Sequence, residues 1–373
     1  MPLEVTVEKL VWRGKALAKT KEEKIILISP PCFPQEQVLV EIYKEKKDFC
    51  LATCQKVLFS PWRRKHPCPH SPVCGGCTFG HVRAQDGLIF KKQILEDALQ
   101  RGLKQKIDFL ITPSPKNWRY RYRGEVFVHK GKPCYYQLNS HKTFPIQDCL
   151  LLDKTLGHNL KNLVQNKSKG SYVVASSPQG KTSIEGDEEL LSFPLKNLPL
   201  TYFLSANTFF QANFRLNNLL IERACTLLKE EERIADLYGG MGNFALALAY
   251  LGKKVLLVEE NPKSLELAKY TAQFNQLKLT LARANLNKDL EPVSRFKPEA
   301  VIIDPPRSGA PNLHNIAHLS GLKKIVWISC DIVNTLRDLK PFWKQGFNLT
   351  YLEFLDMFPQ TYHLEVILVL EKT

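Results

Sequence analysis

From about residue 201 onward, short apolar segments alternate with amphipathic ones, and this alternation limits the possible folds more than any other feature of the chain. The apolar segments are continuous, which is typical of strands covered on both faces, and the others have the three- and four-residue apolar spacing of helices. The pattern predicts a doubly wound, Rossmann-like α/β sheet. The predicted strands are 233–238, 253–260, 299–306, 323–330 and 365–370, and the predicted helices are 210–228, 243–252, 261–275 and 331–343.

The rest of the chain predicts further domains. A length of 373 residues exceeds what one core usually holds, so we expect two or three domains. Residues 1–57 contain several short strand-like runs separated by turn residues, which is typical of a small β-barrel. Residues 58–200 form the predicted central α+β domain, whose helix over 85–104 we expect to pack on the C-terminal domain, residues 201–373.

A glycine turn follows the first predicted strand of the C-terminal domain, in the segment from Asp236 to Phe244. Glycine lets the backbone approach a ligand closely, and the next strand ends in Glu259, where a carboxylate can accept ribose hydroxyls. The Asp-x-x-x-Gly-x-Gly spacing differs from the dinucleotide fingerprint and favours S-adenosylmethionine. A later strand ends in Asp304-Pro305-Pro306-Arg307, at the edge where open α/β sheets bind ligands. Together these features predict a cofactor site.

Four cysteines stand out as candidate metal ligands. Cys68, Cys74 and Cys77 lie close together in a loop rich in proline and glycine, and Cys149 follows a β segment. Four thiolates can hold zinc or an iron–sulfur cluster. Three clustered ligands with one distant ligand favour a [4Fe-4S] cluster, whereas structural zinc sites more often pair their cysteines two and two. We refer to these four residues as the cysteine motif.

Cys330 and Glu365 are the candidate catalytic residues. Cys330 ends an apolar strand just before a helix-like segment, and a thiol at a helix N-terminus is biased toward the nucleophilic thiolate. It is expected at the same sheet edge as Asp304. Glu365 begins the terminal strand, where the sequence alone does not distinguish a catalytic carboxylate from a solvated one.

The charge of the chain indicates a polyanionic partner. It has 52 Lys and Arg against 37 Asp and Glu, a net charge of +15, which suits a protein that binds nucleic acid. The candidate RNA contacts are Arg63, Arg64, Lys65, Arg119, Arg121 and Arg123. No apolar stretch approaches twenty residues and the N-terminus lacks a signal-peptide core, so we expect a cytoplasmic protein. We also expect a monomer.

Taken together, the motifs resemble those of the S-adenosylmethionine-dependent RNA uridine-5 methyltransferases, of the type that forms 5-methyluridine in 23S rRNA. The resemblance covers nearly the whole chain. It rests on the cysteine motif, Phe210–Asn213, Asp236–Phe244, Glu259, Asp304–Arg307, Ser329–Cys330 and Phe358–Glu365. The N-terminal barrel resembles a TRAM domain, an RNA-binding module.

The resemblance implies a role for each matched residue. Cys330 would add to carbon 6 of uracil, S-adenosylmethionine would methylate carbon 5, and Glu365 would remove the carbon 5 proton. The cysteine motif would hold a [4Fe-4S] cluster. The implied cofactor contacts are Gln211, Asp236, Tyr238, Gly240, Gly242, Glu259 and Asp304. One departure is Asp331-Ile332 after the nucleophile, where the family usually has Asn-Pro. An acid beside the thiol opposes thiolate formation unless it points away or caps the helix.

Three alternatives differ in substrate or class. The RNA target could be transfer RNA instead of 23S rRNA. A methyltransferase acting on an exocyclic amine would usually carry an aromatic residue after Asp-Pro-Pro, where this chain has Arg307. A non-catalytic RNA-binding protein with a metal-stabilised fold would need neither the cofactor turn nor Cys330.

Overall fold

The structure is a computed structural model that describes residues 2–71 and 73–372. The chain forms two compact units. The first runs to Asp108 and includes the short segment Phe358–Leu364, and the second comprises Phe109–Met357 and the chain from Glu365 onward. The division into three domains stays a prediction, which independent folding of the segments would test.

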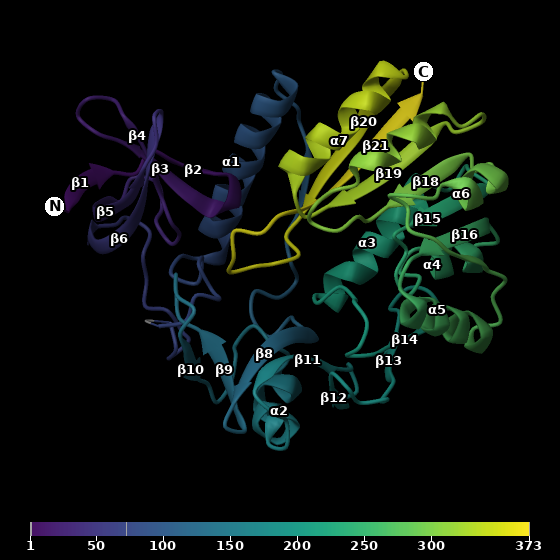
Figure 1. Ribbon diagram of the computed structural model, residues 1–373, viewed down its shortest axis with the longest axis horizontal. Coiled ribbons are helices and arrows are strands. Elements are labelled where there is room, and N and C mark those ends of the chain that lie inside the picture. The colour runs from purple at the N-terminus through teal and green to yellow at the C-terminus, as the bar shows by residue number, and fades with distance from the viewer. Residues whose placement is uncertain (1, 72, 373) are drawn as a thin grey trace. The chain divides into compact units, whose positions relative to one another are not determined.

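The first unit contains a six-stranded sheet in the order β1-β5-β6-β4-β3-β2, whose neighbours are antiparallel except for the parallel pair β4–β6 (Figure 1). Because β1 also contacts β3, the sheet is curled. Alternate residues of β5, such as Val38 and Val40, are fully buried. The elements are β1 (Leu3–Thr6), β2 (Lys9–Val11), the 3-10 helix η1 (Trp12–Gly14), β3 (Lys15–Lys19), β4 (Ile25–Ile28), β5 (Gln37–Glu45) and β6 (Phe49–Phe59).

A long helix, α1 (Ala84–Leu103), completes the first unit and confirms the helix predicted over 85–104. Its buried residues include Ile94, Leu95 and Ala98, at helical spacing, and it packs against β2 and η1 of the same unit. The helix ends where Lys104 adopts a left-handed conformation.

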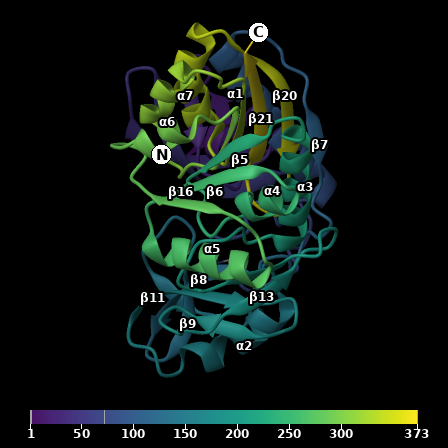
Figure 2. The ribbon, with the colours of Figure 1, turned by 90° about the vertical axis from the view of Figure 1, so that its right-hand side faces the viewer.

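The second unit contains a five-stranded antiparallel sheet covered by a helix (Figure 2). The helix α2 packs Leu156, Leu160 and Val164 onto Val126 and Val174 of the sheet. The sheet order is β10-β9-β8-β11-β12. The elements are β8 (Arg123–His129), β9 (Lys132–Tyr136), β10 (Thr143–Pro145), α2 (Lys154–Val164), β11 (Gly170–Ser176) and β12 (Thr182–Ile184). A short hairpin, β13 (Leu191–Pro194) and β14 (Thr201–Leu204), follows.

The larger part of the second unit is an eight-stranded sheet in the order β17-β16-β15-β18-β19-β21-β20-β7 (Figure 1). The five strands from β17 to β19 are parallel to one another, whereas β21 is antiparallel to both β19 and β20. The strands are β7 (Leu110–Thr112), β15 (Arg233–Leu237), β16 (Lys254–Glu259), β17 (Thr280–Arg283), β18 (Ala300–Ile303), β19 (Lys324–Ser329), β20 (Phe347–Leu355) and β21 (Glu365–Lys372). The predicted α/β sheet is therefore confirmed.

Helices connect these strands and are capped by side chains that the sequence places at their starts. Asn213, Asn261 and Asp331 each accept a backbone N–H of the first turn. The helices are α3 (Phe214–Leu227), α4 (Ala245–Tyr250), α5 (Pro262–Phe274), α6 (Glu291–Phe296), the 3-10 helix η2 (Pro311–His318) and α7 (Ile332–Lys344). None of the helices among the described residues has the length and apolar character needed to cross a membrane.

Candidate active site

The predicted site residues of the second unit come together at one edge of the eight-stranded sheet. Because β15, β16, β18 and β19 are parallel, their carboxyl ends share an edge, and the antiparallel β21 begins there. The strand order reverses between β15 and β18, which is where open α/β sheets bind their ligands. Ser329 pairs with Val366, so the next position along each strand brings Cys330 opposite Glu365.

The glycine turn after β15 is held by two buried or half-buried carboxylates. Asp236 Oδ2 accepts the N–H of Ala245 at 2.9 Å, and Glu259 Oε2 accepts the N–H of Gly240 at 3.0 Å. Gly240 and Gly242 have φ of 55° and 91°, which glycine adopts without strain. Tyr238 has φ of 58° although it is not glycine, so the turn stores strain there. Burial, with Asp304 and Glu259 nearby, raises the pKa of Asp236 to about 8.

The backbone of the glycine turn leaves open space at Gly240. A Cβ added at Gly240 would meet no heavy atom within 4 Å, so the backbone there is open. The Tyr238 hydroxyl is buried and has no hydrogen-bond partner among the described residues. Burial raises the pKa of Tyr238 to about 12, so the group is a neutral donor at physiological pH. An open backbone beside a buried, unpartnered donor is suited to a polar small molecule.

Gln211 and Asp304 link the α3 side of the site to the sheet edge. Gln211 Nε2 donates to Asp304 Oδ2 at 3.2 Å, and the Gln211 side chain is buried. Burial raises the pKa of Asp304 to about 6, although the hydrogen bond from Gln211 opposes the shift. The adjacent Asn213 side chain donates to the Met357 carbonyl at 3.2 Å and so fixes the start of α3.

Cys330 is half-buried, and its thiol is neutral in the free protein. Burial, together with the carboxylates of Glu365 and Asp304, raises the pKa of Cys330 to about 12, although Arg307 acts in the opposite direction. The expectation that the helix N-terminus would favour the thiolate is therefore wrong for the free protein, because burial and two acids outweigh it.

Glu365 is 2% exposed, and burial raises its pKa well above the usual value for a glutamate. Asp304 raises that pKa further and Arg307 lowers it. The sequence had not assigned a role to Arg307 beyond the motif that contains it. Its position after Asp-Pro-Pro at the sheet edge is the feature that could have identified it. The charge on Arg307 thus acts on both candidate catalytic groups.

Asp331, the acid beside the nucleophile, caps α7. Its Oδ1 accepts the N–H of Asn334 at 3.0 Å, and its own N–H donates to Ser329 Oγ at 3.0 Å. Ser329 Oγ also accepts the Thr335 hydroxyl at 2.6 Å. Asp331 is not among the groups that shift the pKa of Cys330. The departure from the usual Asn-Pro therefore supports the helix.

The cysteine motif is divided between the two units: Cys68, Cys74 and Cys77 lie in the first and Cys149 in the second. None of them is in a disulfide. Cys74 Sγ accepts the N–H of Gly76 at 3.4 Å, a contact that suits a ligating thiolate. Among the described residues no set of three or more Cys, His, Asp or Glu is close enough to enclose a metal ion. The cluster therefore stays a prediction.

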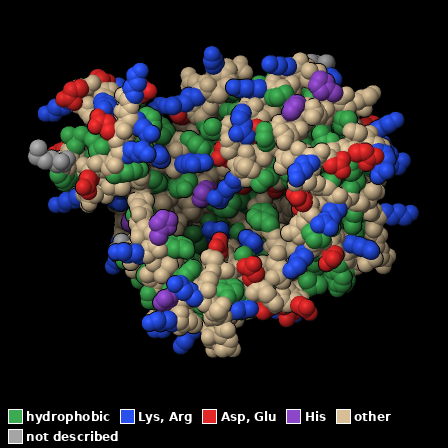
Figure 3. Space-filling model, viewed as in Figure 1, with side chains coloured by type: hydrophobic (Ala, Val, Ile, Leu, Met, Phe, Trp, Pro, Cys, Tyr) green, Lys and Arg blue, Asp and Glu red, His purple; other side chains and the backbone are tan. Residues whose placement is uncertain are grey.

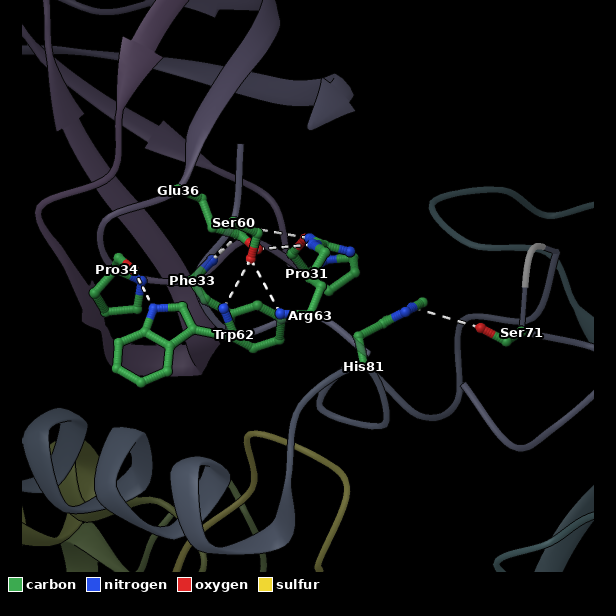
Figure 4. A network of polar contacts seen from close by, with 9 residues as sticks. All are labelled: Pro31, Phe33, Pro34, Glu36, Ser60, Trp62, Arg63, Ser71 and His81. Carbon is green, nitrogen blue, oxygen red and sulfur yellow. Dashed lines mark hydrogen bonds and ion pairs between the residues drawn. The ribbon is translucent and has the colours of Figure 1, made fainter. Parts of the chain in front are cut away.

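Two of the basic residues predicted to contact RNA pair with acids inside their own units. Arg63 Nε lies 2.7 Å from Oε1 of the fully buried Glu36, which also accepts the Ser60 hydroxyl (Figure 4). Arg119 binds Asp148 with both terminal nitrogens, one of them at 2.8 Å. Both arginines neutralise carboxylates, and contact of either one with RNA stays a prediction.

The other four candidate RNA contacts differ in exposure: Arg64 and Lys65 are exposed, and Arg121 and Arg123 are half-buried. Lys and Arg side chains are spread over the face seen in Figure 3. The Arg123 guanidinium lies 5.4 Å from the ring centre of Phe209, which is 61% exposed and stands two residues before Gln211. The Nε atoms of Arg121 and Arg123 are buried without a hydrogen-bond partner among the described residues. The sequence did not single out Phe209, although its place beside the Phe210–Asn213 motif could have done so.

Known proteins resemble this chain over most of its length. The family described as tRNA (Uracil-5-)-methyltransferase matches residues 149–373. An "Uncharacterized RNA methyltransferase" of Aquifex aeolicus is 29% identical, across 99% of this chain and 98% of the relative. The "23S rRNA (uracil(1939)-C(5))-methyltransferase RlmD" of Vibrio parahaemolyticus is 26% identical, across 99% of this chain and 96% of the relative.

One solved structure has the same fold along the whole chain. The Pyrococcus abyssi tRNA (uracil-54, C5)-methyltransferase, solved in complex with S-adenosyl-L-homocysteine, superposes with a TM-score of 0.77. It is 22% identical, and the superposition covers 99% of this chain and 100% of that one. The likeness extends beyond the α/β sheet to the N-terminal unit.

Proposed function

Because the chain belongs to the family of S-adenosylmethionine-dependent RNA uracil-5 methyltransferases, we propose that it methylates carbon 5 of a specific uridine in 23S rRNA through a covalent enzyme–RNA adduct. The observation that carries the proposal is the strand register that brings Cys330 opposite Glu365, beside Asp304. Family membership excludes the non-catalytic RNA-binding alternative.

Cys330 is the proposed nucleophile. Its thiol loses a proton to solvent, and Sγ adds to carbon 6 of the uracil, which moves the electron pair of the 5,6 double bond onto carbon 5. Carbon 5 becomes an enolate-like nucleophile, which free uracil is not. S-adenosylmethionine supplies the methyl group that carbon 5 accepts. Arg307, whose charge lowers the pKa of the thiol, favours its deprotonation. The target base has to leave its stack to reach this edge.

Glu365 is the proposed base. Its carboxylate takes the carbon 5 proton, the electron pair restores the 5,6 double bond, and Cys330 Sγ leaves. A buried carboxylate with a raised pKa binds a proton more readily than a solvated one, which suits proton abstraction from carbon. Asp304 favours the protonated form of Glu365 and so assists this step.

The proposed cofactor site consists of the glycine turn and the groups around it. Glu259 Oε1 already accepts two backbone N–H groups, of Glu260 and Asn261, at 2.9 and 2.8 Å, and its remaining lone pairs are suited to ribose hydroxyls. Gly240 keeps the backbone open, Gly242 adopts the positive φ that the turn requires, and Tyr238 offers its buried hydroxyl. Gln211, Asp236 and Asp304 complete the proposed set.

We further propose that the cysteine motif holds a [4Fe-4S] cluster and that the curled N-terminal sheet is a TRAM-like RNA-binding domain. Four thiols outside any disulfide provide the donor set, and the N–H that Cys74 accepts suits a ligating thiolate. The cluster would be structural, because the proposed chemistry transfers no electron. We expect the enzyme to act as a monomer in the cytoplasm.

Mapping of 5-methyluridine in 23S rRNA and tRNA from a deletion strain tests the target. The proposal predicts that one 23S rRNA position loses its methyl group and that a plasmid copy of the wild-type enzyme restores it, whereas the Cys330→Ala variant does not. Loss confined to tRNA would replace 23S rRNA by the alternative substrate, and unchanged methylation in both RNAs would contradict the proposed function.

A further inference from the structure

The segment immediately before Glu365 contains a tight turn that belongs to the first unit. Phe358–Leu364 is part of that unit, whereas Met357 and Glu365 belong to the second. Within the turn, Thr361 N–H donates to the Phe358 carbonyl at 3.3 Å, Pro359 occupies the second position and Gln360 the third, with φ of 66°. This is the pattern of a type II turn, which normally places glycine at the third position. The turn is therefore strained and needs external support.

A buried lysine supplies part of that support. Lys91, on α1, is 1% exposed, and its Nζ donates to the Phe358 carbonyl at 2.8 Å. The same carbonyl accepts the Thr361 hydroxyl at 2.8 Å. Fully buried lysines are rare, because removing an ammonium group from water costs free energy that an apolar residue would not require. A lysine at this helix position is therefore retained for its polar contacts, among them the hydrogen bond to the Phe358 carbonyl.

Two other parts of the first unit hold the same segment. The Phe79 N–H donates to the Gln360 carbonyl at 2.9 Å. At Gly14, an added Cβ would lie 2.5 Å from Cβ of Tyr362, so the backbone of η1 is in close contact with that residue. Helix α1, the cysteine-bearing loop and η1 thus converge on a few residues of the turn.

We propose that Lys91 is a positioning residue for the base: by holding the Phe358 carbonyl it fixes the turn from which β21 starts, and so sets where the Glu365 carboxylate meets the carbon 5 proton. The inference rests on the proposed function. Only three residues lie between Thr361, the end of the turn, and Glu365, so a displaced turn moves the start of the strand. Cys330 follows β19 and lies outside this segment, so its place in the chain is not fixed by the turn. Lys91 should therefore affect release of the adduct and leave its formation unchanged.

The test compares Lys91→Met with Lys92→Met in the full-length enzyme. Methionine matches the length of lysine and lacks the donor, and replacing a buried charge by an apolar group of similar volume is often tolerated. Lys92 is the matched control, because it neighbours Lys91 on α1 but is exposed and pairs with Glu96. Thermal unfolding of both variants measures any loss of stability, and Gly14→Ala displaces the turn from a second direction without touching Lys91.

Two RNA substrates separate adduct formation from adduct release, each transcribed from whichever RNA the wild type methylates. On the 5-fluorouridine transcript, release is blocked, and Lys91→Met should form the adduct at the wild-type rate. On the uridine transcript, Lys91→Met and Gly14→Ala should accumulate adduct and turn over about 10- to 100-fold more slowly, the range expected for a misplaced catalytic group. Lys92→Met should match the wild type.

Glu365→Gln is the reference that separates the two hypotheses. If Glu365→Gln accumulates adduct and Lys91→Met does not, the positioning role is wrong and the proposed function stands. If neither variant accumulates adduct, the role of Glu365 as base is wrong. If Lys91→Met slows adduct formation on the 5-fluorouridine transcript as much as it slows turnover, Lys91 is a general structural residue and the inference is overturned.

Discussion

The raised pKa of Cys330 predicts an unusually unreactive nucleophile in the free enzyme. With a pKa of about 12, only about one thiol in 10⁴ is ionised at pH 8, against about one in four for an ordinary cysteine. Once formed, the Cys330 thiolate is more basic than that of an ordinary cysteine and therefore attacks sulfur electrophiles faster, by about 40-fold for this difference in pKa between the two thiols. The ionised fraction of Cys330 is roughly 2,000-fold smaller than that of a free thiol, and the faster attack per thiolate offsets only part of this difference. Cys330 should therefore react about 50-fold more slowly than a free thiol.

The measurement is the rate of mixed-disulfide formation with methyl methanethiosulfonate, followed by mass spectrometry of the peptide that contains Cys330. Between pH 7 and pH 10 the rate should rise about tenfold per pH unit, because the thiolate fraction rises in that proportion below the pKa. Cys54 serves as an internal reference, because a hydrogen bond from Cys32 and the charge on Arg63 lower its pKa. Cys54 should react faster and level off earlier.

Two variants should shift the Cys330 rate in opposite directions. Arg307→Gln removes the cation that lowers the pKa of Cys330, so the rate should fall at every pH in this range. Glu365→Gln removes a carboxylate that raises the pKa, so the rate should increase. A wild-type Cys330 that reacts as fast as a free thiol at pH 8 and levels off above pH 9 would refute the argument that burial keeps the thiol neutral.

Three further predictions address catalysis, stability and the cluster. Glu365→Gln should accumulate a methylated RNA–protein adduct that survives denaturing electrophoresis, and Cys330→Ala should form no adduct; an active Cys330→Ala enzyme would end the nucleophile hypothesis. Arg63→Met leaves the carboxylate of Glu36 buried without its cation, so it should lower the free energy of unfolding of the first unit by about 3–5 kcal/mol in denaturant titration. Lys65→Met changes an exposed residue and should alter that free energy by less than about 0.5 kcal/mol. Equal effects of the two variants would contradict the assignment of Arg63 as the partner of a buried carboxylate. Anaerobically purified protein should contain about four irons per chain, and stoichiometric zinc without iron would rule out the cluster.

The strands of the catalytic sheet could be predicted because strands buried on both faces leave a continuous apolar signature. The segments that became β15, β16, β18 and β19 have it. The position of β21 between β19 and β20 could not be predicted, because the order of strands depends on contacts between distant segments. Residues 170–194 fold into β11, β12 and β13, short strands with polar turns whose sequence pattern is weak.

The members of the site were predictable, but their protonation states were not. Asp304 and Cys330 follow strand ends, so their place at the sheet edge follows from the α/β pattern. The pKa of Cys330 depends on how deeply the thiol is buried and on which acids face it, and Glu365 reaches that edge only through the antiparallel pairing of β21. The ion pair between Arg63 and Glu36 could not be predicted either, because the two residues lie far apart in the sequence.

Cys330 and Glu365 have raised pKa values for the same reason, burial beside a third acid, Asp304. A thiol that is neutral in the free enzyme reacts slowly with stray electrophiles, whereas the proposed reaction requires the thiolate. The required fall in the pKa of Cys330 has to come from changes in charge or contacts at this edge, and Arg307 already lowers the pKa of both residues. The proposed chemistry therefore depends on substrate and cofactor binding to complete the site. Asp331 leaves this balance undisturbed, because its carboxylate caps α7 and does not oppose the thiolate.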